Sequence, residues 1–379
     1  MHFALLLLCF LATGAAQDAI PEFKPLIETG NAAYLKGDYA AARESLLKAW
    51  EIMQQMPPSA PERYDLFKRL TSVQTAEEEF AEAEKWLQMA INWRENVLGK
   101  DDPKVADDLL ISVGLARNLK DYGRAQLILG RVAAIHRAAF GPECIPIADD
   151  YSRMAQVFME QKDPENAIAS LSFALRLREK LTGPLDPTLV PELDRLAAAY
   201  IVQRTYPKAE ETYRRSLVIR ETLLGKNDPD LISTVDGLAY SLFGQKKYDE
   251  AEPVYQRLIG LWTRSLSEDH PMVAMAFDKV AVFYAQQKKF DQAKEAMERA
   301  VALRAHFLVE GLALEAAEQT SENHSDEALA LYKRALTVTE PPHPVYAEVR
   351  GKIEEIVKGM DAPLPAPAKA PSKSAQKKK

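Results

Sequence analysis

Histidines are the first candidates for chemistry, because an imidazole can bind a metal ion or move a proton near neutral pH. Beyond residue 16 the chain has five: His136, His270, His306, His324 and His343. No two of them lie at the spacing that places two metal ligands on one helix or turn. The sequence also lacks the Gly-x-Ser-x-Gly, His-Glu-x-x-His and phosphate-binding glycine motifs. We therefore expect no catalytic centre, no metal site and no cofactor.

Adjacent carboxylates could supply a general acid and a general base. The pairs Asp107-Asp108 and Asp149-Asp150 each lie in the expected first turn of a helix. Negative charge at that place complements the partial positive charge of the helix N-terminus. We therefore interpret both pairs as structural.

Basic side chains at a fixed interval are the strongest candidates for a binding site. At steps of 42 residues, one position reads Arg69, Ile111, Arg153, Arg195, Gly237 and Lys279. The position before it reads Lys68, Leu110, Ser152, Asp194, Asp236 and Asp278. Because the fork of a guanidinium matches a carboxylate, this pattern predicts a basic groove that takes carboxylates or an acidic peptide. In the alternative interpretation, charges of adjacent repeats pair with each other, Asp194 with Arg153 and Asp236 with Arg195.

The full set of expected partner contacts has three parts. Charged contacts would come from Lys68, Arg69, Arg117, Arg153 and Arg195, and Lys279 continues their series. Hydrogen bonds would come from Asn31, Tyr34, Asn118 and Gln156. Tyr240 and Phe243 are expected to form an apolar pocket further along the groove.

A 42-residue period determines which elements carry these side chains. An aromatic residue or proline precedes an alanine by three positions in six successive segments, which end at Ala83, Ala125, Ala167, Ala209, Ala251 and Ala293. A fixed period of this length indicates a stack of supersecondary units. Between units, segments such as Gly99 to Pro103 and Gly225 to Pro229 place a glycine before Asp-Pro. Glycine ends one helix, and Asp-Pro begins the next, so the sequence predicts an all-α stack of helix pairs.

The N-terminal unit carries residues at the spacing of a known family: Gly30, Tyr34, Gly37, Tyr39, Ala42 and Ala49. In these features the chain resembles the tetratricopeptide repeat, whose unit is two antiparallel helices. The linkers, together with Ala-Glu-x-x-Tyr at 209–213 and 251–255, resemble the 42-residue repeats of kinesin light chains and their bacterial relatives over about residues 64–308. The resemblance implies a right-handed superhelical solenoid with a concave groove lined by first helices. Those repeats commonly carry paired asparagines at two groove positions, and none remains here.

We expect about eight helix pairs and a C-terminal capping helix. The pairs are predicted near residues 23–56, 64–98, 104–140, 146–182, 188–224, 230–266, 272–308 and 309–340. An amphipathic segment over 344–360 follows, and it would give the end of the stack a polar face.

Both ends of the chain differ from the repeats. Residues 1–16 hold a short apolar run followed by Gly14-Ala15-Ala16, which predicts a signal peptide cleaved near Ala16. The protein would then be periplasmic or secreted, and of bacterial origin; an uncleaved cytoplasmic or N-terminally anchored chain is the alternative. Residues 361–379 are rich in Pro, Ala and Lys and are expected to form a disordered tail, whose lysines would attract an anionic surface or only keep the chain soluble.

Composition and length limit the function. The net charge of −7 argues against nucleic-acid binding, and no segment after residue 16 is apolar enough to span a membrane. Repeats and cap occupy residues 17–360, which leaves no room for a catalytic domain. We expect a non-enzymatic scaffold or adaptor that holds an extended or helical segment of a partner protein, with self-association through its exposed ends also open to it. The alternatives are an envelope protein that binds a small acidic ligand or polymer, and an accessory subunit that delivers substrate to a partner enzyme.

Overall fold

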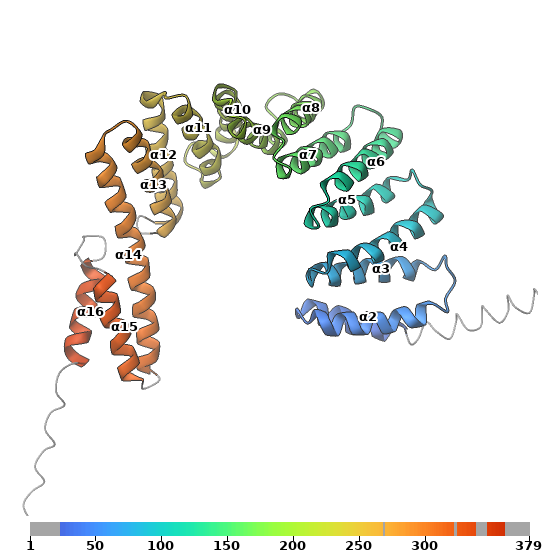
Figure 1. Ribbon diagram of the computed structural model, residues 1–379, viewed down its shortest axis with the longest axis horizontal. Coiled ribbons are helices and arrows are strands. Elements are labelled where there is room, and N and C mark those ends of the chain that lie inside the picture. Colours follow the sequence, from blue (N-terminus) through green and yellow to red (C-terminus); the bar gives the residue numbers. More distant parts are fainter. Residues whose placement is uncertain (1–22, 268–269, 322–323, 339–346, 361–379) are drawn as a thin grey trace, which may run out of the picture. The chain divides into compact units, whose positions relative to one another are not determined.

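The computed structural model describes residues 23–267, 270–321, 324–338 and 347–360, and within these ranges every regular element is a helix (Figure 1). The chain divides into two compact units, Met1–Ile219 and Arg220–Lys379. Consecutive helices pack in antiparallel pairs inside each unit, which confirms the predicted all-α repeat fold. The predicted signal peptide over 1–16 and the predicted tail over 361–379 lie outside the described residues.

The N-terminal unit begins with a helix over residues 23–35. The helices that follow are α2 (Tyr39–Met53), α3 (Pro61–Ala76), α4 (Phe80–Leu98), α5 (Pro103–Asn118), α6 (Tyr122–Phe140), α7 (Ile145–Glu160), α8 (Pro164–Thr182), η1 (Pro187–Leu189), α9 (Val190–Val202) and α10 (Tyr206–Leu224). The last residues of α10 belong to the second unit.

The C-terminal unit continues with η2 (Pro229–Leu231), α11 (Ile232–Gly244), α12 (Tyr248–Leu266), α13 (Pro271–Gln286), α14 (Phe290–Ser321), α15 (Ser325–Val338) and α16 (Ala347–Met360). In the described residues, none of the helices is long and apolar enough to cross a membrane.

The linkers between pairs end one helix and begin the next, as the sequence predicts. Gly99 and Gly225 have φ angles of 94° and 86°, which a glycine adopts without steric cost. The Asp102 side chain accepts a hydrogen bond from the backbone N–H of Lys104 at 2.8 Å. His270 caps α13 in the same way, with Nδ1 accepting from the N–H of Met272 at 3.1 Å. His270 therefore acts as the N-cap of α13.

The turn inside each pair places a residue other than glycine in the left-handed region. These residues recur every 42 positions with φ between 58° and 62°: Glu78, Lys120, Lys162, Arg204, Lys246 and Lys288. In the first pair the corresponding turn uses Gly37, at φ 78°. This conformation costs an L-residue roughly 1–2 kcal/mol, so each of these turns is held by the packing of the two helices that it joins.

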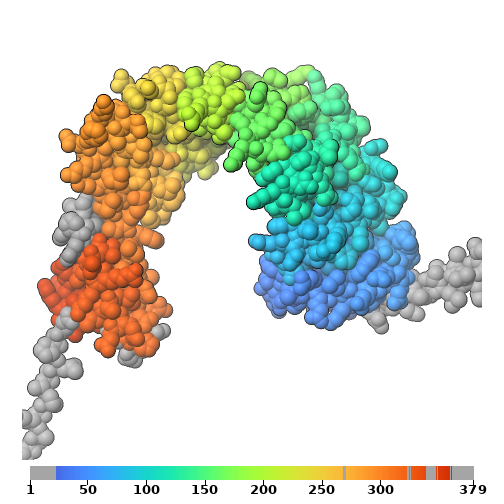
Figure 2. Space-filling model, in the orientation of Figure 1, coloured from blue at the N-terminus to red at the C-terminus, as the bar shows by residue number. Residues whose placement is uncertain are grey.

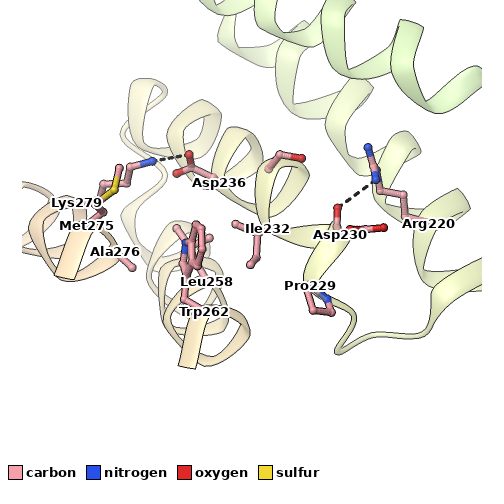
Figure 3. Close-up of a pocket in the computed structure, with 11 residues that line it drawn as sticks. Arg220, Pro229, Asp230, Ile232, Asp236, Leu258, Trp262, Met275, Ala276 and Lys279 are labelled. Atoms are coloured by element: carbon pink, nitrogen blue, oxygen red, sulfur yellow. Dashed lines mark hydrogen bonds and ion pairs between the residues drawn. The ribbon is translucent and has the colours of Figure 1, made fainter. Parts of the chain in front are cut away.

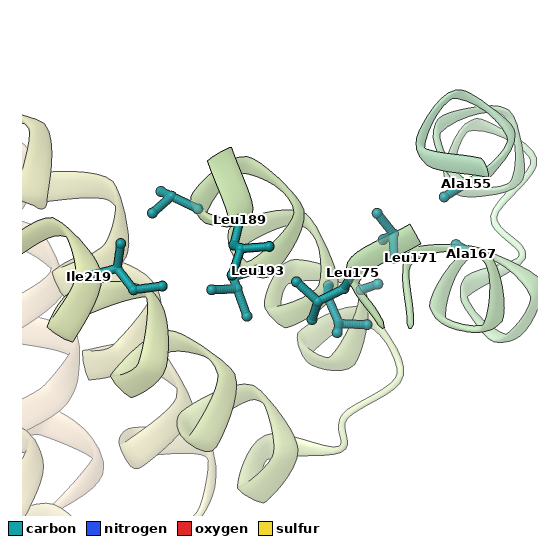
Figure 4. Packing of buried hydrophobic residues seen from close by; sticks show 10 residues of the cluster. Ala155, Ala167, Leu171, Leu175, Leu189, Leu193 and Ile219 are labelled. Carbon is teal, nitrogen blue, oxygen red and sulfur yellow. The ribbon is translucent and has the colours of Figure 1, made fainter. Parts of the chain in front are cut away.

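Small residues let the helices approach closely, and larger ones fill the space between pairs. One core cluster extends from Ala155 of α7 and Ala167 of α8, past Leu171 of α8 and Leu193 of α9, to Ile219 of α10 (Figure 4). Side chains fill the spaces between neighbouring helices throughout each unit (Figure 2). In the first pair, a Cβ atom on Gly30 would lie 2.9 Å from Leu46 Cγ, which explains the glycine.

The end of the stack departs from the sequence expectation. A boundary between repeats was predicted between residues 308 and 309, but α14 is one helix of 32 residues that crosses it without a break. The stretch around Gly311 has no Gly-to-Asp-Pro linker, and Gly311 is helical. The predicted eighth pair therefore has no first helix of its own. The segment α15 packs along the C-terminal part of α14, and α16 packs on both (Figure 1).

Candidate binding site on the first helices

Buried acids recur on the first helices of the N-terminal unit at steps of 42 residues. They are Asp108 on α5, Asp150 on α7 and Glu192 on α9, and each is almost fully buried. Each lies beside a basic side chain of the preceding second helix, and these also recur every 42 residues: Arg94, His136 and Arg178. A buried charge needs such a partner, because desolvation otherwise costs several kcal/mol or more.

Asp108 is the most fully paired of the three. Its Oδ1 accepts hydrogen bonds from the Tyr64 hydroxyl at 2.9 Å and Lys68 Nζ at 3.0 Å. Its Oδ2 lies 3.1 Å from a guanidinium nitrogen of Arg94. Burial, together with the neighbouring Asp108 carboxylate, raises the pKa of the Tyr64 hydroxyl. Lys68, a predicted groove contact, is therefore engaged in this buried cluster.

Asp150 and Glu192 leave the next basic residue on their own helices less engaged. Asp150 lies 2.8 Å from His136 Nδ1 but 3.7 Å from the guanidinium of Arg153. Burial raises the pKa of the Asp150 carboxyl, against the opposing effect of His136. In the next pair, Arg195 lies 3.8 Å from Glu192. Both arginine contacts exceed hydrogen-bond length, so both guanidinium groups keep donors for another acceptor.

A cavity of about 540 Å³ lies where these two arginines converge, between α7, η1 and α9. It is lined by three predicted residues, Arg153, Gln156 and Arg195. The side chains of Arg153 and Arg195 are 44% and 57% exposed. Within the described part of the chain, neither guanidinium donates a hydrogen bond. Two such groups at the wall of one cavity can bind carboxylates through paired N–H···O bonds.

A second cavity, of about 250 Å³, collects four other predicted residues at the start of the unit. Asn31 and Tyr34 come from the first helix, and Lys68 and Arg69 come from α3. Arg69 donates a hydrogen bond to Asn31 Oδ1 at 2.5 Å. Because Arg69 is bonded to Asn31 and Lys68 to Asp108, this cavity offers a ligand mainly neutral hydrogen-bonding groups.

Arg117 and Asn118 line neither cavity. Arg117 forms a two-bond ion pair with Glu160 of α7, with its Nε 3.0 Å from Oε2, and this pairing raises the pKa of the guanidinium. Asn118 is exposed at the C-terminal end of α5. The expectation that Arg117 offers its charge to a partner is therefore not met in this structure, because Glu160 occupies the fork.

Charges of adjacent repeats do pair, but in the described residues neither predicted pair forms, Asp194 with Arg153 or Asp236 with Arg195. Lys68 pairs with Asp108, and Lys279 pairs with Asp236, each from one first helix to another. Arg153 instead lies nearest to Asp150 on its own helix, and Asp194 accepts a hydrogen bond from Ser216 Oγ at 2.6 Å. Some basic residues of the 42-residue series are therefore engaged in ion pairs, whereas others face the cavity between α7 and α9.

Tyr240 and Phe243, which are predicted to form an apolar pocket, line neither of the two cavities above. Their ring centroids are 6.4 Å apart, and the Phe243 ring packs on Tyr248 and Phe283 at 6.3 and 6.2 Å. Phe243 therefore belongs to an aromatic cluster inside the C-terminal unit. Tyr240 is half exposed.

An apolar cavity of about 540 Å³ does occur elsewhere in the C-terminal unit (Figure 3). Its apolar wall is formed by Leu258, Trp262 and Met275, and Lys279 and Asp236 lie together at one edge. Trp262 stands 84 residues, or two repeats, after Arg178, and Ala276 stands 84 residues after Glu192. In this repeat, apolar residues therefore occupy the two positions that hold the buried ion pair two repeats earlier. The sequence carries a signal for this change, because it appears when positions 42 residues apart are aligned.

The described residues contain no group of three or more His, Cys, Asp or Glu side chains that could hold a metal ion.

Comparison with known proteins identifies the type of repeat in part of the chain. Two family models of the tetratricopeptide repeat match residues 193–230 and 231–305. Residues 193–305 carry tetratricopeptide repeats. No curated protein matches the chain.

Solved structures support the repeat fold. The C-terminal part of a TPR repeat-containing protein from Cytophaga hutchinsonii is 15% identical with a TM-score of 0.50, over 73% of this chain and 95% of that chain. Aspartyl phosphate phosphatase F from Bacillus subtilis is 14% identical with a TM-score of 0.50, and the match covers 78% of this chain and 75% of that chain. BtubC (BKLC) from P. vanneervenii is 20% identical over 61% and 92%, but at a TM-score of 0.49 it supports no argument. At these identities the first two show the fold alone.

Proposed function

We propose that this protein is a non-enzymatic scaffold that binds an acidic segment of a partner protein in the cavity between α7 and α9. The observation that supports this most is the pair Arg153 and Arg195, which face one cavity with guanidinium groups that donate no hydrogen bond to any described residue. Gln156 adds an amide to the same wall. An extended or helical segment with closely spaced Asp or Glu residues fits these donors.

The cavity near the N-terminus extends the same proposal. Asn31, Tyr34 and Arg69 lie on the first helices of pairs one and two, and a segment running along the first helices would meet them with hydrogen-bonding side chains. Tetratricopeptide repeats present such a row of first helices, and a row of separated subsites suits a linear peptide better than a compact ligand.

Binding of a labelled oligoglutamate peptide, followed by fluorescence anisotropy, tests the proposal. The Arg153→Glu/Arg195→Glu variant should lose binding by at least tenfold, because two attractive charges become repulsive. The matched control is Arg137→Glu/Arg176→Glu, which makes the same charge change at exposed positions on second helices. The control should bind nearly as the wild type does, and both variants should melt as the wild type does.

Three outcomes would redirect the proposal. Equal loss in both variants would mean that net charge alone attracts the peptide, so that the cavity has no special role. A large drop in the melting temperature of Arg153→Glu/Arg195→Glu alone would mean that the two arginines are structural. If a small dicarboxylate competes at the same concentration as the peptide, the site is one for a small acidic ligand.

We also propose that the chain is exported from a bacterial cell after cleavage near Ala16, and that its 42-residue repeats are of the kinesin-light-chain type. The apolar run before Gly14-Ala15-Ala16 supports export. The intact mass of the native protein tests it: a mature chain beginning near Gln17 is expected, and an intact N-terminus would contradict it.

A further inference from the structure

One position of the second helices is buried in every pair before the last. It is Leu87, Leu129, Leu171, Tyr213 and Tyr255 at steps of 42 residues, and none is more than 7% exposed. Within each unit, a residue 28 positions further along, on the next first helix, covers it. Leu129 packs in one cluster with Val157, Leu171 packs with Ala199, and the rings of Tyr255 and Phe283 lie 5.0 Å apart. This contact is the stacking interface of the repeat.

The same position in α14 is Met297, and it is 47% exposed. The residue that would cover it is Ser325, but α14 continues to Ser321 before the chain turns. At 1.5 Å per residue, the chain has moved about 36 Å from Met297 by that point. The returning helix α15 has 14 residues, or about 21 Å. It can therefore cover only the C-terminal part of α14, where Val309, Leu312 and Ala316 pack with Tyr332.

The N-terminal part of α14 is left with an exposed apolar stripe, which we call the α14 stripe: Phe290, Met297, Val301 and Leu308. These side chains are 67%, 47%, 56% and 46% exposed. Their spacings of 7, 4 and 7 residues place all four within about 20° of one line along the helix. Together they expose an area on the order of a few hundred Å², which is the size of the largest apolar patches found on single-chain proteins.

We propose that two copies of this chain associate through the α14 stripe, as an antiparallel pair of α14 helices. Met297, near the middle of the stripe, occupies the position that a first helix covers in the earlier repeats, so a helix is the shape that the stripe fits there. It is also symmetric in sequence: Phe290 and Leu308 lie nine residues to either side of Arg299, and Met297 and Val301 lie two residues to either side. A twofold axis at that level places Phe290 opposite Leu308 of the second copy, and Met297 opposite Val301.

The charges beside the stripe are compatible with this pairing. Lys294 and Glu298 form an exposed pair on one side, with their charged atoms 3.8 Å apart. Arg304 lies on the other side and pairs with Asp278 of α13. The twofold axis keeps Lys294 of one copy on the side away from Arg304 of the other, so no charge is brought into the seam. The inference does not depend on the proposed peptide site, which lies in the other unit.

Sedimentation equilibrium of the full chain tests the association. The wild type should be a dimer at micromolar concentration, and Met297→Glu/Val301→Glu should raise the dissociation constant at least 100-fold, because four carboxylates would be buried. The matched control is Leu127→Glu/Leu181→Glu, at exposed leucines of α6 and α8, and it should stay dimeric. A wild type that is monomeric at every concentration would overturn the proposal, as would a dimer that Met297→Glu/Val301→Glu leaves intact.

Disulfide formation tests the antiparallel register, in a chain with Cys9 and Cys144 replaced by serine. Phe290→Cys and Leu308→Cys should each stay uncrosslinked alone, and a mixture of the two variants should form crosslinked pairs. Efficient crosslinking of either variant by itself would mean a parallel or different pairing, which overturns the proposed register.

Discussion

Replacement of Asp108 by asparagine should weaken the junction between α4 and α5 by about 3 kcal/mol. Asp108 is 1% exposed and holds Tyr64, Lys68 and Arg94 on its two oxygens. Asparagine keeps the shape and one acceptor but removes the charge that compensates the largely buried guanidinium of Arg94, whose side chain is 14% exposed. Removing one partner of a buried ion pair costs about 3–5 kcal/mol. We expect the lower end of that range, because the amide oxygen still accepts a hydrogen bond and Lys68 can turn to solvent.

Native-state hydrogen exchange measures this effect locally, which matters because a stack of repeats need not unfold in one step. The amides of α4 and α5 should exchange with an opening free energy lower by about 3 kcal/mol in Asp108→Asn. Glu44→Gln, which breaks the exposed pair with Lys48 on α2, is the control and should leave exchange unchanged. An opening free energy within about 1 kcal/mol of the wild type would refute the claim that buried ion pairs hold successive repeats together.

Two further predictions concern stability. Lys162 has a φ of 61°. Lys162→Gly should raise the free energy of unfolding by roughly 0.5 kcal/mol, because the relief of left-handed strain exceeds the added freedom of glycine in the unfolded chain. A lower urea midpoint in the variant would contradict this. Burial raises the pKa of Asp150, so the folded state holds that proton more tightly than the unfolded chain, and wild-type stability gains as the pH falls through that pKa. Asp150→Asn lacks this gain, so its free energy of unfolding relative to the wild type should decline from pH 7 to pH 4 in urea titrations. A difference in unfolding free energy that stays constant with pH would show that Asp150 does not titrate this way.

Local rules explain why most of the fold could be predicted from the sequence. Gly99 and Asp102 act within one turn of the chain, so their end and start signals are readable without a structure. The period then gives the pairs. The prediction of a repeat boundary after residue 308 was wrong, because the amphipathic pattern there continues within one helix, α14. In the sequence, only the absence of a Gly-to-Asp-Pro linker indicates this.

The sequence predicts where the basic side chains of the candidate site lie along the first helices, but not which of them have donors left for a ligand. The 42-residue register placed Lys68, Arg153 and Arg195 on first helices. It could not show that Lys68 is bound by a buried carboxylate, because Asp108 reaches it from the next pair. Nor could it show that Arg153 is left with free donors, because His136 of another helix already engages Asp150. Side-chain pairing between helices depends on distances that no single repeat contains.

Binding of the partner by Arg153 and Arg195 can be measured by hydrogen–deuterium exchange with and without the oligoglutamate peptide. We expect protection over residues 149–160 of α7 and 187–197 of η1 and α9, and no such protection in Arg153→Glu/Arg195→Glu. Protection confined to other helices, or the same protection in the charge-reversed variant, would contradict the claim that these two arginines hold the partner.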